Sequence, residues 1–173
     1  MPARRSLSHV DGRGRIRMVD VGQKPETDRE AVATAEIRVS KAAVSAVRRG
    51  KVKKGDPLQI ARIAGIQAAK RTSDMIPLCH PLALSHVDID IKPRPWGYEL
   101  QSVVRTTGRT GVEMEALAAV TVAALTIYDM LKAVDRAMTI GKIAVLEKRG
   151  GRSGHYVAAG AVARAGRRKI ANK

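Results

Sequence analysis

A run of 13 residues without a charged side chain, from Ala116 to Tyr128, constrains the fold of this 173-residue chain more than any other feature. Glu115 and Asp129 flank the run, so it is well short of the roughly 20 apolar residues that a membrane-spanning helix needs. A helix that is apolar on nearly all sides is typical of the interior of a folded domain. We therefore expect a buried helix from about residue 112 to residue 134.

The rest of the composition indicates what surrounds this helix. The chain has no Phe, one Trp and three Tyr, so aliphatic residues and many Ala must build the core, and small residues favour closely packed helices. At this length the chain fits one ordinary domain. The single Cys cannot form an internal disulfide and supplies too few ligands for a structural zinc motif, so we expect no metal site. Because no apolar run follows the first arginines, we expect no secretory signal and a cytoplasmic location.

Capping residues and the alternation of apolar residues predict the other elements. Ser40 and Asp56 are suited to N-cap positions, Pro57 suits the first position of a helix, and "PRPWG" suits the turn of a hairpin. In the helix that Pro57 opens, Leu58 and Ile66 lie on one side, with Ile60 and Ile63 beside them. The expected strands cover residues 34–39, 86–92, 98–106 and 140–148, and the expected helices cover residues 41–49, 57–71 and 112–134.

The order of these elements predicts an α+β fold, a ferredoxin-like βαββαβ sandwich with an antiparallel sheet. Its helices would cover one face of the sheet. The other face would then need cover from a partner or from the N-terminal arm, which favours an oligomer. We divide the chain into an extended arm (residues 1–30), a ferredoxin-like catalytic domain (31–158) and a basic, disordered tail (159–173).

The formal net charge of +16 suggests an anionic partner. Much of the excess lies at the ends, because residues 1–17 carry five Arg against Asp11 and residues 141–173 carry nine Lys or Arg against Glu147. The tail after residue 158 has no aromatic residue, which argues against a stacking platform for single strands. Because of the high positive charge, a basic nucleic-acid-binding protein is the alternative function. We nevertheless expect neither a specific nucleic acid nor a membrane as partner.

Four ionisable residues near the ends of the long helix are candidates for chemistry. Asp129 and Lys132 are three residues apart and share one face, where they form either a structural salt bridge or part of a pocket. In a pocket they would act as acid and base, with the pKa of a partly desolvated Lys lowered toward neutrality. Glu113 and Glu115 in the first turn could also simply stabilise the helix dipole.

The spacing of these groups limits how one site could use them. Glu115 and Asp129 are 14 residues apart, which is about 20 Å along a helix. Either the ligand is long, as a nucleoside triphosphate is, or the site lies between protomers. A sheet face that needs cover favours the second possibility.

The segment "PLCHP", residues 77–81, suits a binding loop. Cys79 and His80 are adjacent, so in an extended segment their side chains point to opposite sides and make a poor nucleophile and base pair. The prolines make the loop rigid, and such a loop can offer backbone groups and one imidazole to a ligand. We expect Cys79 to be buried and inert.

Three basic clusters could bind phosphates, although each could also be a solvated turn. The last of them, in "EKRGGRSG", resembles an anion-binding nest in which glycines let backbone N–H groups converge. No dinucleotide fingerprint, P-loop, zinc-protease helix or nucleophile elbow is present. The clusters are Lys51, Lys53 and Lys54; Lys70 and Arg71; and Lys148, Arg149 and Arg152.

Three motifs in order, "IARIAGIQAAKRTSDMIPLCHPL", "TGRTGVEMEALAAVTVAALTIYDMLKAVD" and "GGRSG", resemble the cyclic pyranopterin monophosphate synthase family of molybdenum cofactor biosynthesis. The likeness extends from "SHVDGRGRIRMVDVGQK" to "GGRSGHY". It implies a ferredoxin-like homohexamer, a trimer of dimers, with active sites between subunits. It also implies a lyase that converts (8S)-3',8-cyclo-7,8-dihydroguanosine 5'-triphosphate to cyclic pyranopterin monophosphate and pyrophosphate.

The resemblance assigns roles to residues motif by motif. Asp129 and Lys132 of "YDMLK" would be catalytic, with Lys54 of "KKGD" assisting. The implied reaction needs proton transfers and a phosphoryl displacement, so no cofactor is required, although Mg²⁺ could accompany the phosphates. The residues expected to contact the substrate are Leu78, Cys79, His80, Met114 and Glu115, with Glu113, Lys70 and Lys148 as weaker candidates.

The chain departs from the family pattern in its last loop. The family more often has Lys-Ser-Gly-Gly-Lys-Ser-Gly, whereas Arg149 and Arg152 stand at the second and fifth places here. Arg keeps the charge and adds a forked donor, so binding should survive, but Arg could not replace a Lys that transfers protons.

Overall fold

Two helices begin at the capping residues that the sequence indicated. In the computed structural model, which describes residues 9–152 and 154–159, Ser40 accepts a hydrogen bond from the backbone N–H of Ala43 at the start of α1 (Lys41–Arg48). Asp56 accepts from the N–H groups of Leu58 and Gln59 at the start of α2 (Pro57–Lys70). Each cap contributes about 1 kcal/mol. A single turn, α3 (Thr72–Met75), follows α2 and was not predicted.

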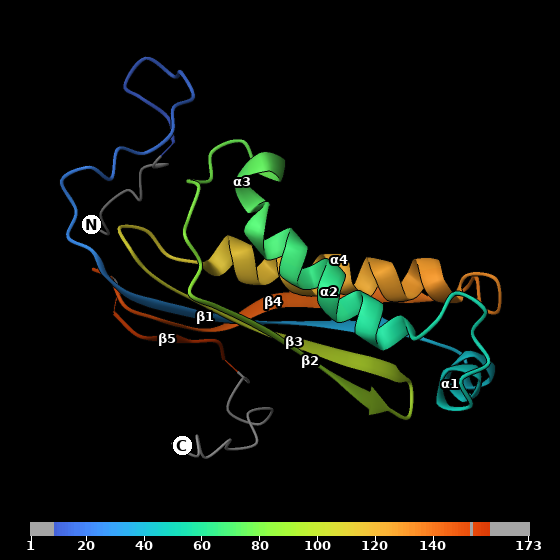
Figure 1. Ribbon diagram of the computed structural model, residues 1–173. Coiled ribbons are helices and arrows are strands. Elements are labelled where there is room, and N and C mark those ends of the chain that lie inside the picture. Colours follow the sequence, from blue (N-terminus) through green and yellow to red (C-terminus); the bar gives the residue numbers. More distant parts are fainter. Residues whose placement is uncertain (1–8, 153, 160–173) are drawn as a thin grey trace, which may run out of the picture.

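The strands form one five-stranded antiparallel sheet in the order β2-β3-β1-β4-β5 (Figure 1). The α+β class and the predicted hairpin between the second and third strands are confirmed. The strands are β1 (Thr27–Arg38), β2 (His86–Arg94), β3 (Gly97–Gly108), β4 (Thr139–Arg149) and the short β5 (Tyr156–Val157).

The N-terminal region differs from its prediction. Pairing in β1 begins at Thr27, opposite Gly108, so the strand is longer than expected and includes residues that we had assigned to the arm. The arm itself folds back, because Val10 bridges Ile16 and the N–H of Arg17 donates to the carbonyl of His9. Residues 1–8 of the arm and 160–173 of the tail lie outside the described residues.

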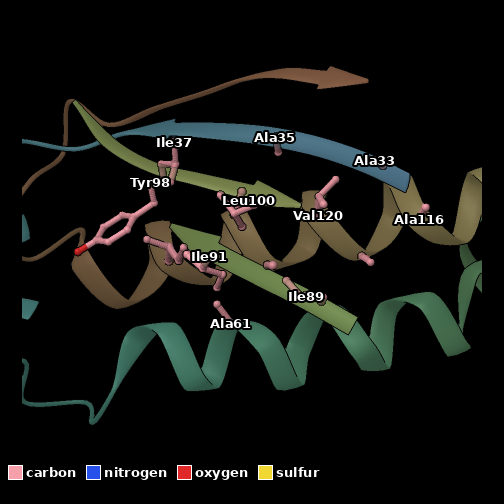
Figure 2. Close-up of a cluster of buried hydrophobic side chains, with 14 of the residues drawn as sticks. Ala33, Ala35, Ile37, Ala61, Ile89, Ile91, Tyr98, Leu100, Ala116 and Val120 are labelled. Atoms are coloured by element: carbon pink, nitrogen blue, oxygen red, sulfur yellow. The ribbon is translucent and has the colours of Figure 1, made fainter. Parts of the chain in front are cut away.

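The long helix α4 (Glu113–Leu131) is the centre of the core, as expected, although it ends three residues before residue 134. Together with α2 it lies on one face of the sheet (Figure 1). Figure 2 shows α4 residues Ala116 and Val120 near β1 and β3, where Leu100 and Ile37 are fully buried. Burial of each such side chain contributes roughly 1.5–3 kcal/mol.

Small residues let α2 and α4 approach closely, as the composition predicted. A Cβ atom on Gly65 of α2 would collide with the side chain of Ile89 and the carbonyl oxygen of Ala119. Ala61 of α2 is fully buried, whereas Ile63 is 62% exposed. The closest contacts of α2 are therefore made by its small residues, while Leu58 and Ile66 are partly buried against the core.

The opposite face of the sheet is mostly polar. Ion pairs join neighbouring strands there, between Arg105 and Glu30 and between Lys142 and Glu36. Thr34 is buried and donates to the carbonyl of Leu100. Charged side chains on this face are thus paired across strands. Cover of this face by a partner stays a prediction.

By length and composition, α4 also meets the criteria for a membrane-spanning helix. Half of its most apolar window is buried inside the domain, and a core helix meets the same criteria. Its packing against α2 and the sheet accounts for its apolar character.

Candidate active site

The C-terminal end of α4 carries a cluster of three charged side chains. Lys132 Nζ lies 2.8 Å from Asp129 Oδ1, and Lys54 Nζ lies 3.0 Å from Asp129 Oδ2. Lys54 also donates to the main-chain carbonyl of Asp129 at 3.3 Å. Lys54 comes from the loop before α2, so tertiary folding brings the predicted catalytic residues together. With Tyr128, Ala133 and Arg136 they line a cavity of about 430 Å³.

The charges of this cluster stabilise each other. Hydrogen bonds from Lys132 and Lys54 hold the pKa of Asp129 below its ordinary value, and the hydrogen bond to Asp129 raises the pKa of Lys132. The sequence had suggested a lysine with a lowered pKa, and within this chain that direction is wrong. The Lys132 side chain is 55% exposed, so its contact with Asp129 outweighs desolvation.

The N-terminal end of α4 lines a second cavity, of about 310 Å³. The loop after α3 and the N-terminal arm provide its other walls. The structure therefore brings together most of the residues that were predicted to contact a substrate. The predicted residues in this cavity are Leu78, Cys79, His80, Glu113, Met114 and Glu115, and the arm adds His9, Val19, Val21 and Lys24.

Burial governs the titration of two groups in this cavity. Glu115 is only 4% exposed, and its burial raises its pKa, with the nearby charge of Glu113 adding to the effect. Burial also raises the pKa of the Cys79 thiol, and the charge of Glu115 acts in the same direction. Cys79 is half-buried rather than fully buried. A protonated thiol is a weak nucleophile, which agrees with an inert Cys79.

Two histidines connect this cavity to the arm. His80 Nε2 lies 2.9 Å from the carbonyl oxygen of Val19. A carbonyl can only accept, so Nε2 carries the proton and Nδ1 of a neutral His80 is an acceptor. His9 Nδ1 is buried and has no hydrogen-bond partner among the described residues. The arm thus brings an unused polar atom to the cavity.

A third cavity, of about 650 Å³, adjoins the second one and is strongly basic. Both cavities are lined by Lys24, Thr110, Gly111 and Glu113, and Lys148 Nζ lies 3.7 Å from a Glu113 carboxylate oxygen. The cationic residues that line it are Lys24, Arg29, Arg109, Lys148, Arg149 and Arg152. Within residues 9–152 and 154–159, no three His, Cys, Asp or Glu side chains are placed to hold a metal ion.

The loop after β4, where the sequence predicted an anion-binding nest, contains two glycines with left-handed backbone conformations. Gly150 and Gly151 have φ values of 92° and 74°, which L side chains rarely adopt. A Cβ atom on Gly150 would also collide with the carbonyl oxygen of Asp28. These two glycines therefore allow the chain to turn at the basic cavity, where Arg152 follows them.

Comparison with known proteins identifies the family. The model of the MoaC family matches residues 18–151, which is most of the chain. The chain belongs to the MoaC family. Relatives named cyclic pyranopterin monophosphate synthase come from Thermomicrobium roseum (55% identity over 87% of this chain and 92% of the relative) and Roseiflexus sp. (56%, covering 87% and 97%). One from Peptoclostridium acidaminophilum is 52% identical, covering 87% and 96%.

In this MoaC chain the candidate residues form two groups rather than one. Glu115 and Asp129 lie near opposite ends of α4, about 21 Å apart along the helix. The loop with His80 lies at one end, and Lys54 lies at the other. Lys70, the last residue of α2, was a weaker candidate for substrate contact. It is exposed and lines none of the three cavities described above.

Reasoning from the sequence missed several residues that line the two adjoining cavities. His9, Val19, Val21 and Lys24 come from the arm, and Arg29 and Arg109 come from β1 and the loop after β3. The arm segment that contains the first four belongs to the MoaC-like motif "SHVDGRGRIRMVDVGQK", which was the available signal. Periodicity could not reveal them, because their contacts are distant in sequence.

Proposed function

We propose that this chain is a lyase of molybdenum cofactor biosynthesis. It converts (8S)-3',8-cyclo-7,8-dihydroguanosine 5'-triphosphate to cyclic pyranopterin monophosphate and releases pyrophosphate. The names of its close relatives support this activity. The structural observation that carries the proposal is the basic cavity of six Lys and Arg residues that adjoins the cavity of Glu115 and His80.

The two adjoining cavities suit the two parts of this substrate. The triphosphate binds in the basic cavity, where Arg and Lys side chains make charge-assisted hydrogen bonds to its oxygens. The fused ring system then occupies the smaller cavity, beside His80 and Glu115. Lys24 lines both cavities and is placed to contact the junction between phosphate and ring system.

The raised pKa of Glu115 suits acid–base chemistry. Forming the product requires opening an aminal, rebuilding a pyrazine ring and closing a cyclic phosphate, which are proton transfers and one displacement. Glu115, with its raised pKa, can hold and release a proton closer to neutral pH than an ordinary carboxyl group. Lys54 and Lys132 are proton donors, and Asp129 orients both.

The proposed chemistry involves no redox step and so requires no redox cofactor. Mg²⁺ bound to the phosphates of the substrate is compatible with the same scheme. Turnover measured with and without a chelator distinguishes a metal-dependent from a metal-independent reaction.

We place the complete site between subunits. The distance between Glu115 and Asp129 along α4 is too large for one compact pocket, and the Asp129 side chain is 56% exposed, as expected for a group that a neighbour would cover. A homohexamer, a trimer of dimers, would pair the two ends of α4 from different chains. The strand order β2-β3-β1-β4, with α2 and α4 on one face, supports a ferredoxin-like subunit.

The proposal retains the division into an arm, a catalytic domain and a basic tail. The arm contributes cavity walls, so it is part of the catalytic unit. A location in the cytoplasm is consistent with a nucleotide-derived substrate.

The proposal is tested by incubating the purified chain with the cyclised dihydro-GTP and measuring pyrophosphate and pyranopterin product. Wild-type protein should form both products, whereas Asp129→Asn should form neither at a comparable rate. Asp74→Asn is the matched control, because Asp74 is an exposed carboxylate in α3 that lines none of the described cavities of the site. If folded wild-type oligomer forms no product, the lyase proposal is wrong, and salt-dependent binding of nucleic acid would be measured next.

A further inference from the structure

A fourth cavity, of about 990 Å³, lies away from the candidate site. It is bordered by α1, the start of α2 and the turn between β2 and β3, and no residue predicted to act in catalysis lines it. Its walls are largely aliphatic, with four cationic or anionic residues among them. The apolar residues are Val44, Val47, Val52, Pro57, Leu58, Pro93 and Pro95, and the charged ones are Lys41, Arg48, Asp56 and Arg94.

Tyr98 brings an unused hydroxyl group to this cavity. The residue is 2% exposed, and its hydroxyl has no hydrogen-bond partner among the described residues. In Figure 2 the ring extends away from the aliphatic cluster with the hydroxyl at its tip. A buried hydroxyl without a partner is unfavourable, so a hydrogen-bond acceptor brought here would be stabilised. Burial raises the pKa of Tyr98, which keeps the group a donor.

The charges near this hydroxyl favour an anion. Arg48 and Asp56 are the two charged residues that act on Tyr98. The Asp56 carboxylate is already used, because it accepts from two backbone N–H groups at the start of α2. Arg94 is paired with Glu99, whereas no described carboxylate forms an ion pair with Arg48. Arg48 is therefore available to a ligand.

We propose that this cavity binds a small organic acid with an apolar, aromatic or aliphatic, body. Its carboxylate accepts from the Tyr98 hydroxyl and pairs with Arg48, while the body packs against Val44, Val47 and Leu58. The volume is within the range of small-molecule sites. A cationic ligand would be repelled by Arg48, and a neutral one would leave its charge unpaired.

Occupancy of the cavity affects the loop that carries Lys54. Val52 and Gly55 line the cavity on either side of Lys54 in the sequence, and Lys54 holds Asp129 at 3.0 Å. A bound acid restrains this loop and changes how often Lys54 contacts Asp129. This consequence for turnover rests on the proposed lyase function, whereas binding itself does not.

Binding is tested by isothermal titration calorimetry of the full-length oligomer with 2-naphthoate. Wild-type protein should bind 2-naphthoate. The affinity should fall at least about tenfold in Arg48→Gln and several-fold in Tyr98→Phe. Arg49→Gln is the matched control, because Arg49 is exposed, follows Arg48 and does not line the cavity. Tyr98→Phe should also raise the thermal midpoint without ligand, because it removes an unpaired buried hydroxyl.

Three results would overturn the binding proposal. They are no heat of binding with the wild type, equal affinities of Arg48→Gln and Arg49→Gln, and a crystal structure in which a neighbouring subunit fills the cavity.

The effect on Lys54 is tested by measuring turnover of the cyclised dihydro-GTP with saturating 2-naphthoate. Wild-type turnover should change at least about twofold, and Arg48→Gln should not respond at the same concentration. Unchanged wild-type turnover at saturation would refute the link to Lys54 and leave the binding result intact. If the wild type binds 2-naphthoate but has no turnover under any condition, the lyase proposal fails while the binding site stands.

Discussion

Glu115, near the start of α4, is 4% exposed and surrounded by cavity walls, whereas the side chain of Asp129, at the other end, is 56% exposed and contacts two ammonium groups. Burial raises the pKa of Glu115, and hydrogen bonds from Lys132 and Lys54 lower the pKa of Asp129. The pKa values of two carboxyl groups on one helix are therefore shifted in opposite directions. Their surroundings, rather than their residue type, decide the direction of each shift.

The two ends of α4 also differ in how far other parts of the chain enclose them. The start of α4 is enclosed by the arm, the loop with His80 and the loop after β4. The other end has a small cavity in which Lys54, Asp129 and Lys132 remain about half exposed. We expect a neighbouring subunit to cover this end, and desolvation would then oppose the raised pKa of Lys132.

The largest effect on turnover is expected when the carboxylate at either end of α4 is removed. Asp129→Ala and Glu115→Gln should each lower turnover by about 100-fold or more, because each removes a proton-transfer or positioning group. If sites form between chains, co-expressed mixed oligomers should regain about a quarter of wild-type activity, since each site combines ends from two chains. Turnover of the separately purified and the mixed proteins measures this.

Mixed oligomers that stay as inactive as the single variants would show that both ends act within one chain. Asp74→Asn removes an exposed carboxylate elsewhere. It should retain wild-type turnover both when purified alone and when mixed with wild-type chains.

The basic cavity is tested by reducing its charge. Arg152→Gln should raise KM by about tenfold with a smaller change in kcat, because it removes a charge-assisted hydrogen bond to the triphosphate. Arg152→Lys should restore most of the affinity. Steady-state kinetics at two salt concentrations provides the measurement. Arg71→Gln is the control, because Arg71 is an exposed arginine outside the cavity. The same rise in KM in this variant would contradict a specific role of Arg152.

His9 tests whether the arm belongs to the enclosed end. Its unpaired Nδ1 lines the cavity of Glu115, so His9→Ala should lower kcat/KM by about tenfold through loss of one hydrogen bond to the substrate. His9→Asn, with an amide that can replace that atom, should recover part of the loss. His86→Ala is the control, because His86 is exposed at the start of β2. Equal kinetics for His9→Ala and wild type would exclude this role.

The pH dependence of folding stability tests the raised pKa of Glu115. The folded-state pKa of Glu115 is raised above 4.5, so the folded protein binds its proton more tightly and loses stability as the pH rises above this value. Glu115→Gln should therefore raise the thermal midpoint by a few degrees at about pH 7.5, with a gain that shrinks toward pH 4.5. Scanning calorimetry across this range checks the sign. A constant difference at all pH values would contradict the assignment.

The smallest effect is expected at Cys79. Its thiol pKa is raised above 9.0, so alkylation by iodoacetamide should be slow at neutral pH and accelerate only above that pH. Cys79→Ala should keep turnover within about twofold, because an inert thiol performs no chemistry. Fast alkylation at pH 7 would show a reactive thiolate instead.

Local sequence signals predicted much of the fold. Ser40 and Asp56 cap helices as expected, and the turn "PRPWG" joins β2 and β3. These features depend on contacts between residues close in the chain, so they can be recognised without a structure. The buried α4 was equally accessible, because a long uncharged run has few other stable environments in a folded domain.

Other features could not be predicted because they depend on distant contacts. In α2 the bulky Ile60 and Ile63 are exposed, whereas Ala61 and Gly65 are buried against α4. The sequence pattern did not reveal that the close approach of α4 leaves room only for small side chains there. The extra length of β1 likewise depends on its pairing with β3.

The sequence by itself determined the class of fold, the family and the residues of both ends of α4, because motifs and periodicity are local and specific. Only the tertiary structure decided which residues share a cavity, that the arm lies beside His80 and Glu115, and that the pKa values of Glu115 and Asp129 shift in opposite directions. The physical reason is that burial and electrostatic contact depend on distances between atoms far apart in the chain, which the order of residues does not specify.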